Sequence, residues 1–221
     1  LHFSIGLAAV LTGAGLYWAS PYAATWDEVD FALALERYDL LAMQPHFPGY
    51  PYFILGGMAV HAVIANPAKA LSVLNVLVLF SAVFPLVWLL RRHVSHSSSL
   101  LAALAVFSST YAFFAAARPM SDGAALGVFW WYMWAVERAH RQKTWKAQLL
   151  PTALFSVLMG VRLSYAPFGA ALLLLWHEDW KTHRRFGRVV LSAAAAAAFQ
   201  FIWVAAVARP EGGLFPFFKL G

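Results

Sequence analysis

Apolar runs almost free of charged residues recur along this 221-residue chain, and they restrict it to one broad class of fold. Runs of about 20 apolar residues predict helices that cross a lipid bilayer. Only 12% of the residues are charged, whereas a soluble domain has about 25%. We therefore predict an all-α polytopic membrane protein. The runs are 1–19, 50–66, 70–90, 99–117, 123–136, 147–176 and 188–208.

Charge and residue usage exclude several classes of function. The net charge of +6 would suit a nucleic-acid partner, but the basic residues lie at the ends of the apolar runs, as the positive-inside rule predicts for membrane loops. We therefore expect no nucleic-acid partner. The chain has no cysteine and no HExxH-type spacing, so neither a disulfide framework nor a zinc site is predicted. We predict that residues 1–221 form a single transmembrane module. The alternative is that this module is truncated at its C-terminus.

The run 147–176 is interrupted by a single charge, Arg162. One long span would place this arginine in the hydrocarbon, at a high cost in free energy. A hairpin that turns at Arg162 avoids that cost and puts the basic loops 138–146 and 177–188 on one side. We predict the hairpin. Loop 91–98 then joins the same, cytoplasmic side, while Arg118 and Arg162 face the opposite side.

Segment 50–66 decides which side the acidic residues face. If it crosses the membrane, Asp27 is cytoplasmic; if it lies in the interface, Asp27 is extracytoplasmic. The segment is near the lower length limit for a span and contains a glycine pair, so we favour the interface, with residues 20–69 as the first outer loop. The seven predicted spans are 1–19, 70–90, 99–117, 123–136, 147–161, 163–176 and 188–208.

Five of the ten acidic residues lie between positions 27 and 39, which makes this stretch the main candidate for chemistry. Thr25 followed by Glu28 is a capping-box pattern, so a helix should begin at Trp26, and Pro45 should end it near Met43. The apolar residues Trp26, Val29, Leu33 and Leu40 predict a helix that lies in the membrane interface. Glu28 has a simpler explanation as well, since carboxylates favour helix N-termini.

Three further groups of residues are candidates. His46 lies in the aromatic, proline-rich run QPHFPGYP, beside Tyr50. Arg118 and Asp122 lie in the sequence RPMSD between two predicted spans, and Arg162 lies at the predicted hairpin turn. An arginine near a carboxylate is suited to phosphate binding, although a snorkelling arginine and a capping Asp122 would look the same.

The sequences WDEVDFALAL and QPHFPGYPYF, with RPMSD as a weaker match, resemble the GT-C superfamily of integral-membrane glycosyltransferases. The most similar members are bacterial proteins related to protein O-mannosyltransferases and lipid A aminoarabinose transferases. Where the mannosyltransferases have His after Asp-Glu-Val, this chain has Asp30; where they have His-Pro-Pro, it has His46-Phe47-Pro48. The resemblance implies a module of about seven membrane helices, with juxtamembrane helices in the first outer loop.

The resemblance also implies an activity: transfer of a sugar from a polyprenyl-phosphate donor to an acceptor hydroxyl, with inversion, outside the bacterial inner membrane. The implied partners are this donor, membrane lipid and an unidentified acceptor. No cofactor is required, although a divalent cation such as Mg²⁺ or Mn²⁺ is compatible with the carboxylates. The alternatives are a non-enzymatic transporter or flippase, and an inactive membrane module of a longer protein.

Roles follow from the implied reaction. Asp27 and Glu28 are the candidate catalytic residues, with Asp27 as the base that accepts the proton of the acceptor hydroxyl. The candidate substrate-binding residues are Asp30, His46, Tyr50, Arg118, Asp122 and Arg162. Arg118 and Arg162 would neutralise the donor phosphate, and Asp122 would hold Arg118.

Overall fold

The computed structural model describes residues 2–220. Helices are the only regular secondary structure of these residues, apart from one isolated bridge between Asp39 and Gln44. The α-helices are α1 (His2–Trp18), α2 (Trp26–Ala34), α3 (Pro51–His61), α4 (Pro67–Ser81), α5 (Val83–Leu90), α6 (His96–Phe107), α7 (Thr110–Ala117), α8 (Asp122–Gln142), α9 (Leu149–Val161), α10 (Ala170–His183), α11 (Phe186–Ala208) and α12 (Leu214–Phe218). Two 3₁₀ helices, η1 (Lys146–Gln148) and η2 (Leu163–Gly169), precede α9 and α10. The prediction of an all-helical chain is confirmed.

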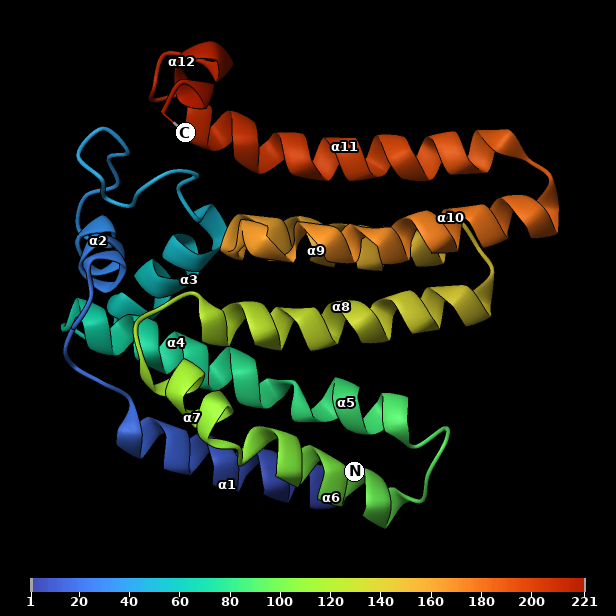
Figure 1. The fold of residues 1–221 in the computed structure, drawn as a ribbon, viewed down its shortest axis with the longest axis horizontal. Helices are drawn as coiled ribbons and strands as arrows, with labels where there is room; N and C mark the ends of the chain where they lie inside the picture. Colours follow the sequence, from blue (N-terminus) through green and yellow to red (C-terminus); the bar gives the residue numbers. More distant parts are fainter. Residues whose placement is uncertain (1, 221) are drawn as a thin grey trace.

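The longer helices run side by side along one direction, so the molecule has two ends (Figure 1). The α2 end, on the left of the figure, holds α2, α3, the first turn of α4, the first turn of α8 and the turn between α9 and η2. The basic end, on the right, holds the connections α5–α6, α8–α9 and α10–α11. The predicted hairpin at Arg162 is present, because α9 runs toward the α2 end and α10 runs back from it (Figure 1).

Two helices of residues 2–220 are long and apolar enough to cross a membrane, the continuous stretch Pro67–Leu90 and α11. A third would be the pair α6–α7, but it bends by 59° at Ser108–Ser109. The predicted span 99–117 is therefore broken. Ser109 accounts for the break, because its hydroxyl caps the N-terminus of α7 and so starts a new helix. These helices are consistent with a membrane protein.

The close approach of α4 and α8 holds the centre of the bundle together. A Cβ atom on Gly127 of α8 would lie 2.5 Å from the backbone oxygen of Val78 in α4, so only glycine permits this spacing. Leu71, Val76 and Leu79 of α4 are fully buried. The α4–α8 pair is thus the fixed frame on which both ends are built.

Residues 20–66 leave the bundle and return to it at the same end. Ser20 donates to the carbonyl of Ala117, and the ammonium of Lys69 donates to the carbonyl of Ala19. Within this segment α3 has 11 residues, about 16 Å at ~1.5 Å per residue, which is well short of a bilayer. It lies at the α2 end and does not run the length of the bundle (Figure 1).

Helix α2 begins at Trp26, as predicted, but ends at Ala34, so the prediction of a helix to near Met43 is wrong. Asp39 explains the early end: its carboxylate accepts from the backbone N–H of Ala42, and its backbone pairs with that of Gln44. These local bonds compete with helix continuation. Trp26, Val29 and Leu33 form an exposed apolar stripe, as expected, whereas Leu40 is buried.

Candidate functional site

The site is built on the first turn of α2, where the predicted capping box is present. The carboxylate of Glu28 accepts from the backbone N–H groups of Ala24 and Thr25, at 2.5 and 3.1 Å. It also accepts from Nε of Arg118, and its side chain is completely buried. Burial raises the pKa of Glu28, but the bond from Arg118 and the backbone bonds outweigh this effect and lower the pKa below 4.5.

Arg118 is oriented by two contacts. Its Nε donates to Glu28, and its guanidinium carbon lies 4.9 Å from the centre of the Phe114 ring, in a cation–π arrangement. The side chain borders a cavity of about 200 Å³ that Tyr111 and Asp122 also line. We expected Asp122 to hold Arg118, and this expectation is wrong: the carboxylate that holds Arg118 is Glu28.

Asp122 contacts the other candidate arginine. Arg162 lies with Nη1 3.1 Å from the Asp122 carboxylate and 3.0 Å from the hydroxyl of Ser121, which is fully buried. Arg162 reaches this position because the hairpin turn after α9 meets the first turn of α8 at the α2 end (Figure 1). Both arginines are therefore held by carboxylates, each by a different one from a different helix.

Asn75 of α4 fixes the backbone that carries Arg118 and Asp122. Its side-chain amide donates to the carbonyls of Arg118 (2.7 Å) and Met120 (2.6 Å), and its side-chain oxygen accepts from the N–H of Ala124 (2.8 Å). Asn75 is completely buried. Sequence reasoning missed this residue, although an asparagine inside the apolar run 70–90 is a visible signal, because a buried amide needs partners.

Asp30, His46 and Tyr50 form a second group beside these pairs. Nδ1 of His46 lies 3.4 Å from the Asp30 carboxylate, and Nε2 lies 2.9 Å from the Tyr50 hydroxyl. Burial raises the pKa of Tyr50; the charge of Arg162 opposes this effect, and those of Asp27 and Asp122 add to it. Both groups lie at the α2 end, because Asp30 belongs to α2, Tyr50 directly precedes α3 and Asp122 begins α8 (Figure 1).

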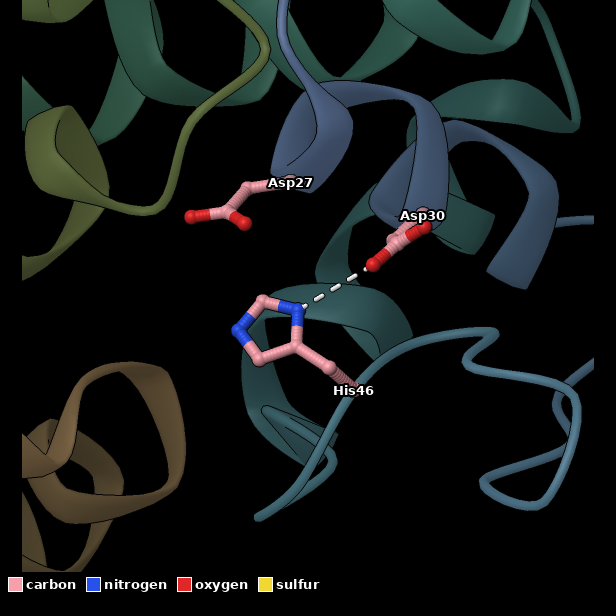
Figure 2. A group of neighbouring side chains, drawn as sticks. All are labelled: Asp27, Asp30 and His46. Carbon is pink, nitrogen blue, oxygen red and sulfur yellow. Dashed lines mark ion pairs between the residues drawn. The ribbon is translucent and has the colours of Figure 1, made fainter.

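Asp27, Asp30 and His46 also have a geometry that suits a cation. One ligand atom from each lies within 4.8 Å of the others, and Figure 2 shows the three side chains around a common space. Nδ1 of His46 is buried and makes no hydrogen bond among the described residues. Two carboxylates and an imidazole suit a divalent ion such as Mn²⁺ or Zn²⁺ better than Mg²⁺, which prefers oxygen ligands alone.

All eight predicted site residues thus lie at the α2 end, but they differ in exposure and contacts. Asp27 is exposed and forms no ion pair among residues 2–220, whereas Glu28 is buried and fully engaged. Searches of protein-family models, of curated proteins and of solved structures find no match to this chain.

Proposed function

We propose that this protein is a membrane glycosyltransferase of the GT-C type, which moves a sugar from a polyprenyl-phosphate donor to a hydroxyl outside the membrane. One observation carries the proposal: an exposed carboxylate, Asp27, shares one end of the bundle with two arginines that are each held by a carboxylate. A base and two fixed cations are what the transfer of a sugar from a phosphate requires.

An apolar groove near Arg162 supports a lipid-linked donor. It has a volume of about 740 Å³, lies between α9, η2, α10 and α11, and begins at Leu163, next to Arg162 in the chain. An isoprenoid chain in this groove would bring the attached phosphate to Arg162. Helix α11, which forms one wall of this groove, is mostly exposed and apolar.

The proposed membrane arrangement has seven crossings: α1, α4–α5, α6–α7, α8, η1–α9, η2–α10 and α11. The α2 end then faces outside, and the basic end faces the cytoplasm, in agreement with the positive-inside rule. Helix α2 lies in the outer interface, with the exposed Trp26, Val29 and Leu33 directed to lipid. Helix α3 stays at the same level, because residues 20–66 return to the end that they leave.

The reaction proceeds by direct displacement. Asp27 takes the proton of the acceptor hydroxyl, the hydroxyl oxygen bonds to the anomeric carbon, and the bond from that carbon to the phosphate oxygen breaks. Polyprenyl phosphate leaves with the bonding electrons, and Arg118 and Arg162 stabilise its charge. Attack opposite the phosphate inverts the anomeric centre. Glu28 acts through Arg118 as a positioning residue, and His46 and Tyr50 line the sugar site.

A divalent ion offers a variant of this mechanism. Bound at Asp27, Asp30 and His46, it would lower the pKa of a coordinated acceptor hydroxyl, and Asp27 would serve as its ligand. A chelator distinguishes the two: transfer that survives EDTA requires Asp27 as base, and transfer that is restored by Mn²⁺ requires the ion.

Replacement of Asp27 tests the proposal. The variant Asp27→Asn, incubated with polyprenyl-phosphate sugars in detergent, should lose transfer by about 10²-fold or more. Glu36→Gln is the matched control, because Glu36 is an exposed carboxylate just beyond α2 with no contact to the site. Normal turnover by Asp27→Asn in the presence of EDTA would remove Asp27 from the mechanism. Donor binding without transfer by the wild type would favour a transporter or an inactive module.

A further inference from the structure

The basic end of the bundle lies opposite the candidate site (Figure 1). It contains a cavity of about 270 Å³ between the C-terminal turns of α8 and α10. Its lining combines cations, imidazoles and carboxylates. The charged and titratable residues that line it are His140, Lys143, Glu178, Asp179, Lys181 and His183. Nothing in the proposed glycosyl transfer uses this cavity.

Both carboxylates of the cavity are already engaged. Asp179, whose side chain is 4% exposed, accepts two bonds from Arg188, at 2.7 and 3.0 Å, and lies 3.2 Å from Nδ1 of His183. Glu178 of α10 lies 2.5 Å from Nδ1 of His140 of α8. Each carboxylate of the cavity therefore already has a basic partner.

The two lysines of the cavity are free to bind an anion. Lys143 and Lys181 form no ion pair with any residue of the part of the chain that the structure describes, residues 2–220. Lys143 also has a fixed backbone, because its carbonyl accepts from Nη2 of Arg188 at 3.0 Å. The lining has two lysines and two carboxylates, and Arg188, which is outside the lining, neutralises Asp179. The cavity together with Arg188 therefore has an excess of positive charge before either histidine is protonated.

An apolar groove of about 310 Å³ adjoins this cavity, and the two share His140, Leu175 and Glu178 as lining residues. The groove follows α8 and α10 away from the basic end. Its apolar lining consists of Leu89, Trp130, Met133, Val136, Ala171, Leu174 and Leu175. Glu137 also lines the groove, and its carboxylate is paired with Arg92 and Arg141. A cationic cavity that continues into an apolar groove matches an amphiphile with an anionic head and a hydrocarbon chain.

We infer that this end of the protein binds one anionic phospholipid. The phosphate lies at Lys143 and Lys181, and one acyl chain lies in the groove between α8 and α10. Lysine binds phosphate as a point charge, so no fixed fork of donors is needed. The inference uses the membrane placement proposed above, with the basic end at the cytoplasmic leaflet, where anionic lipids attract basic segments. It does not depend on glycosyl transfer.

Lipid binding to the purified full chain in detergent tests the inference, with native mass spectrometry to count bound molecules. Phosphatidylglycerol and phosphatidylcholine with identical acyl chains are the probes. The wild type should bind one phosphatidylglycerol molecule much more tightly than phosphatidylcholine. The double variant Lys143→Gln/Lys181→Gln should lose about 10-fold or more of this affinity.

The matched control is Lys146→Gln/Arg184→Gln, which removes the same charge from the same end, outside the cavity lining. It should retain the affinity for phosphatidylglycerol. Equal losses in the two double variants would show a diffuse charge effect and overturn the site, as would equal affinity for the two lipids.

Ala171→Phe tests the groove separately, because it fills the chain site and leaves both lysines intact; unchanged binding would overturn the placement of the acyl chain. No sugar donor is present in these assays, so their failure leaves the proposed function untouched.

Discussion

The buried ion pair between Glu28 and Arg118 leads to an asymmetric prediction for stability. The Glu28 side chain is completely buried, whereas that of Arg118 is 26% exposed. Removing Arg118 therefore strands a buried carboxylate, which typically costs about 3–5 kcal/mol. Removing the charge of Glu28 strands a cation that still reaches water, and an amide oxygen in the place of Oε2 can still accept from the backbone N–H groups of Ala24 and Thr25. We expect Glu28→Gln to cost about 2 kcal/mol, the value of a charge-assisted hydrogen bond.

A double-mutant cycle measures the coupling between the two side chains. The proteins to compare are the wild type, Glu28→Gln, Arg118→Met and the double variant, each unfolded by denaturant titration in detergent micelles. The double variant should be more stable than the sum of the two single losses predicts, by about 1–3 kcal/mol, since the isolated buried charge is gone. Asp27→Asn is the control, because this neighbouring carboxylate is exposed and should be nearly neutral for stability.

Two outcomes would refute this reasoning. Additivity within about 0.5 kcal/mol would mean that Glu28 and Arg118 do not interact in the folded protein. A larger loss for Glu28→Gln than for Arg118→Met would mean that the capping bonds to Ala24 and Thr25, and not the ion pair, determine the stability of this turn.

Three further predictions concern the same frame. The pKa of the Glu28 carboxyl is lower in the folded than in the unfolded chain, so the ionised carboxylate stabilises the fold. This stabilisation is complete above pH 4.5 and is lost as the pH falls through the pKa of the folded state. Unfolding free energies measured over a pH series should show the loss in the wild type and not in Glu28→Gln. Asn75→Leu should cost about 3 kcal/mol, because it leaves three buried backbone groups unpaired. Asn75→Asp should not restore the stability, because its second carboxylate oxygen would face the carbonyls of Arg118 and Met120; unfolding titrations measure both losses. Gly127→Leu should lower the free energy of unfolding by about 2–3 kcal/mol, because the added side chain forces α8 away from Val78. Gly6→Leu should leave the free energy of unfolding nearly unchanged in the same titration, because nothing lies within 4 Å of the added Cβ.

Much of the fold could be predicted from local pattern alone. Apolar runs predict the helical class, Thr25 and Glu28 predict the start of α2, and the cost of a buried Arg162 predicts the hairpin. Each of these three predictions depends on residues that are near one another in the chain, or on the cost of placing one charge in lipid. The end of α2 was predicted wrongly because the Asp39 carboxylate accepts a hydrogen bond from the backbone N–H of Ala42. This local bond favours a turn over the helix, and the apolar spacing of the segment gives no sign of that turn.

The pairing of charges could not be predicted from the sequence. Glu28, Asp122, Arg118 and Arg162 all lie at one end, so either arginine was a possible partner for either carboxylate. The choice depends on side-chain reach across packed helices: Arg118 ends α7 and reaches α2, while Arg162 follows α9 and reaches α8. Asn75 was missed for the same reason, because its three partners lie more than 40 positions away.

The observed pairing leaves each arginine with N–H donors that an anion can still bind. Glu28 contacts only Nε of Arg118. Neither terminal nitrogen of Arg118 makes a hydrogen bond with any of residues 2–220. A guanidinium has five N–H donors in a fixed plane, so a carboxylate on one edge orients the remaining donors. Asp122 and Ser121 engage Nη1 of Arg162 in the same way. The carboxylates therefore fix the direction of the free donors before an anion arrives, which reduces the ordering cost of binding it. Asp27 is exposed and lies outside both pairs, as the role of base proposed for it requires.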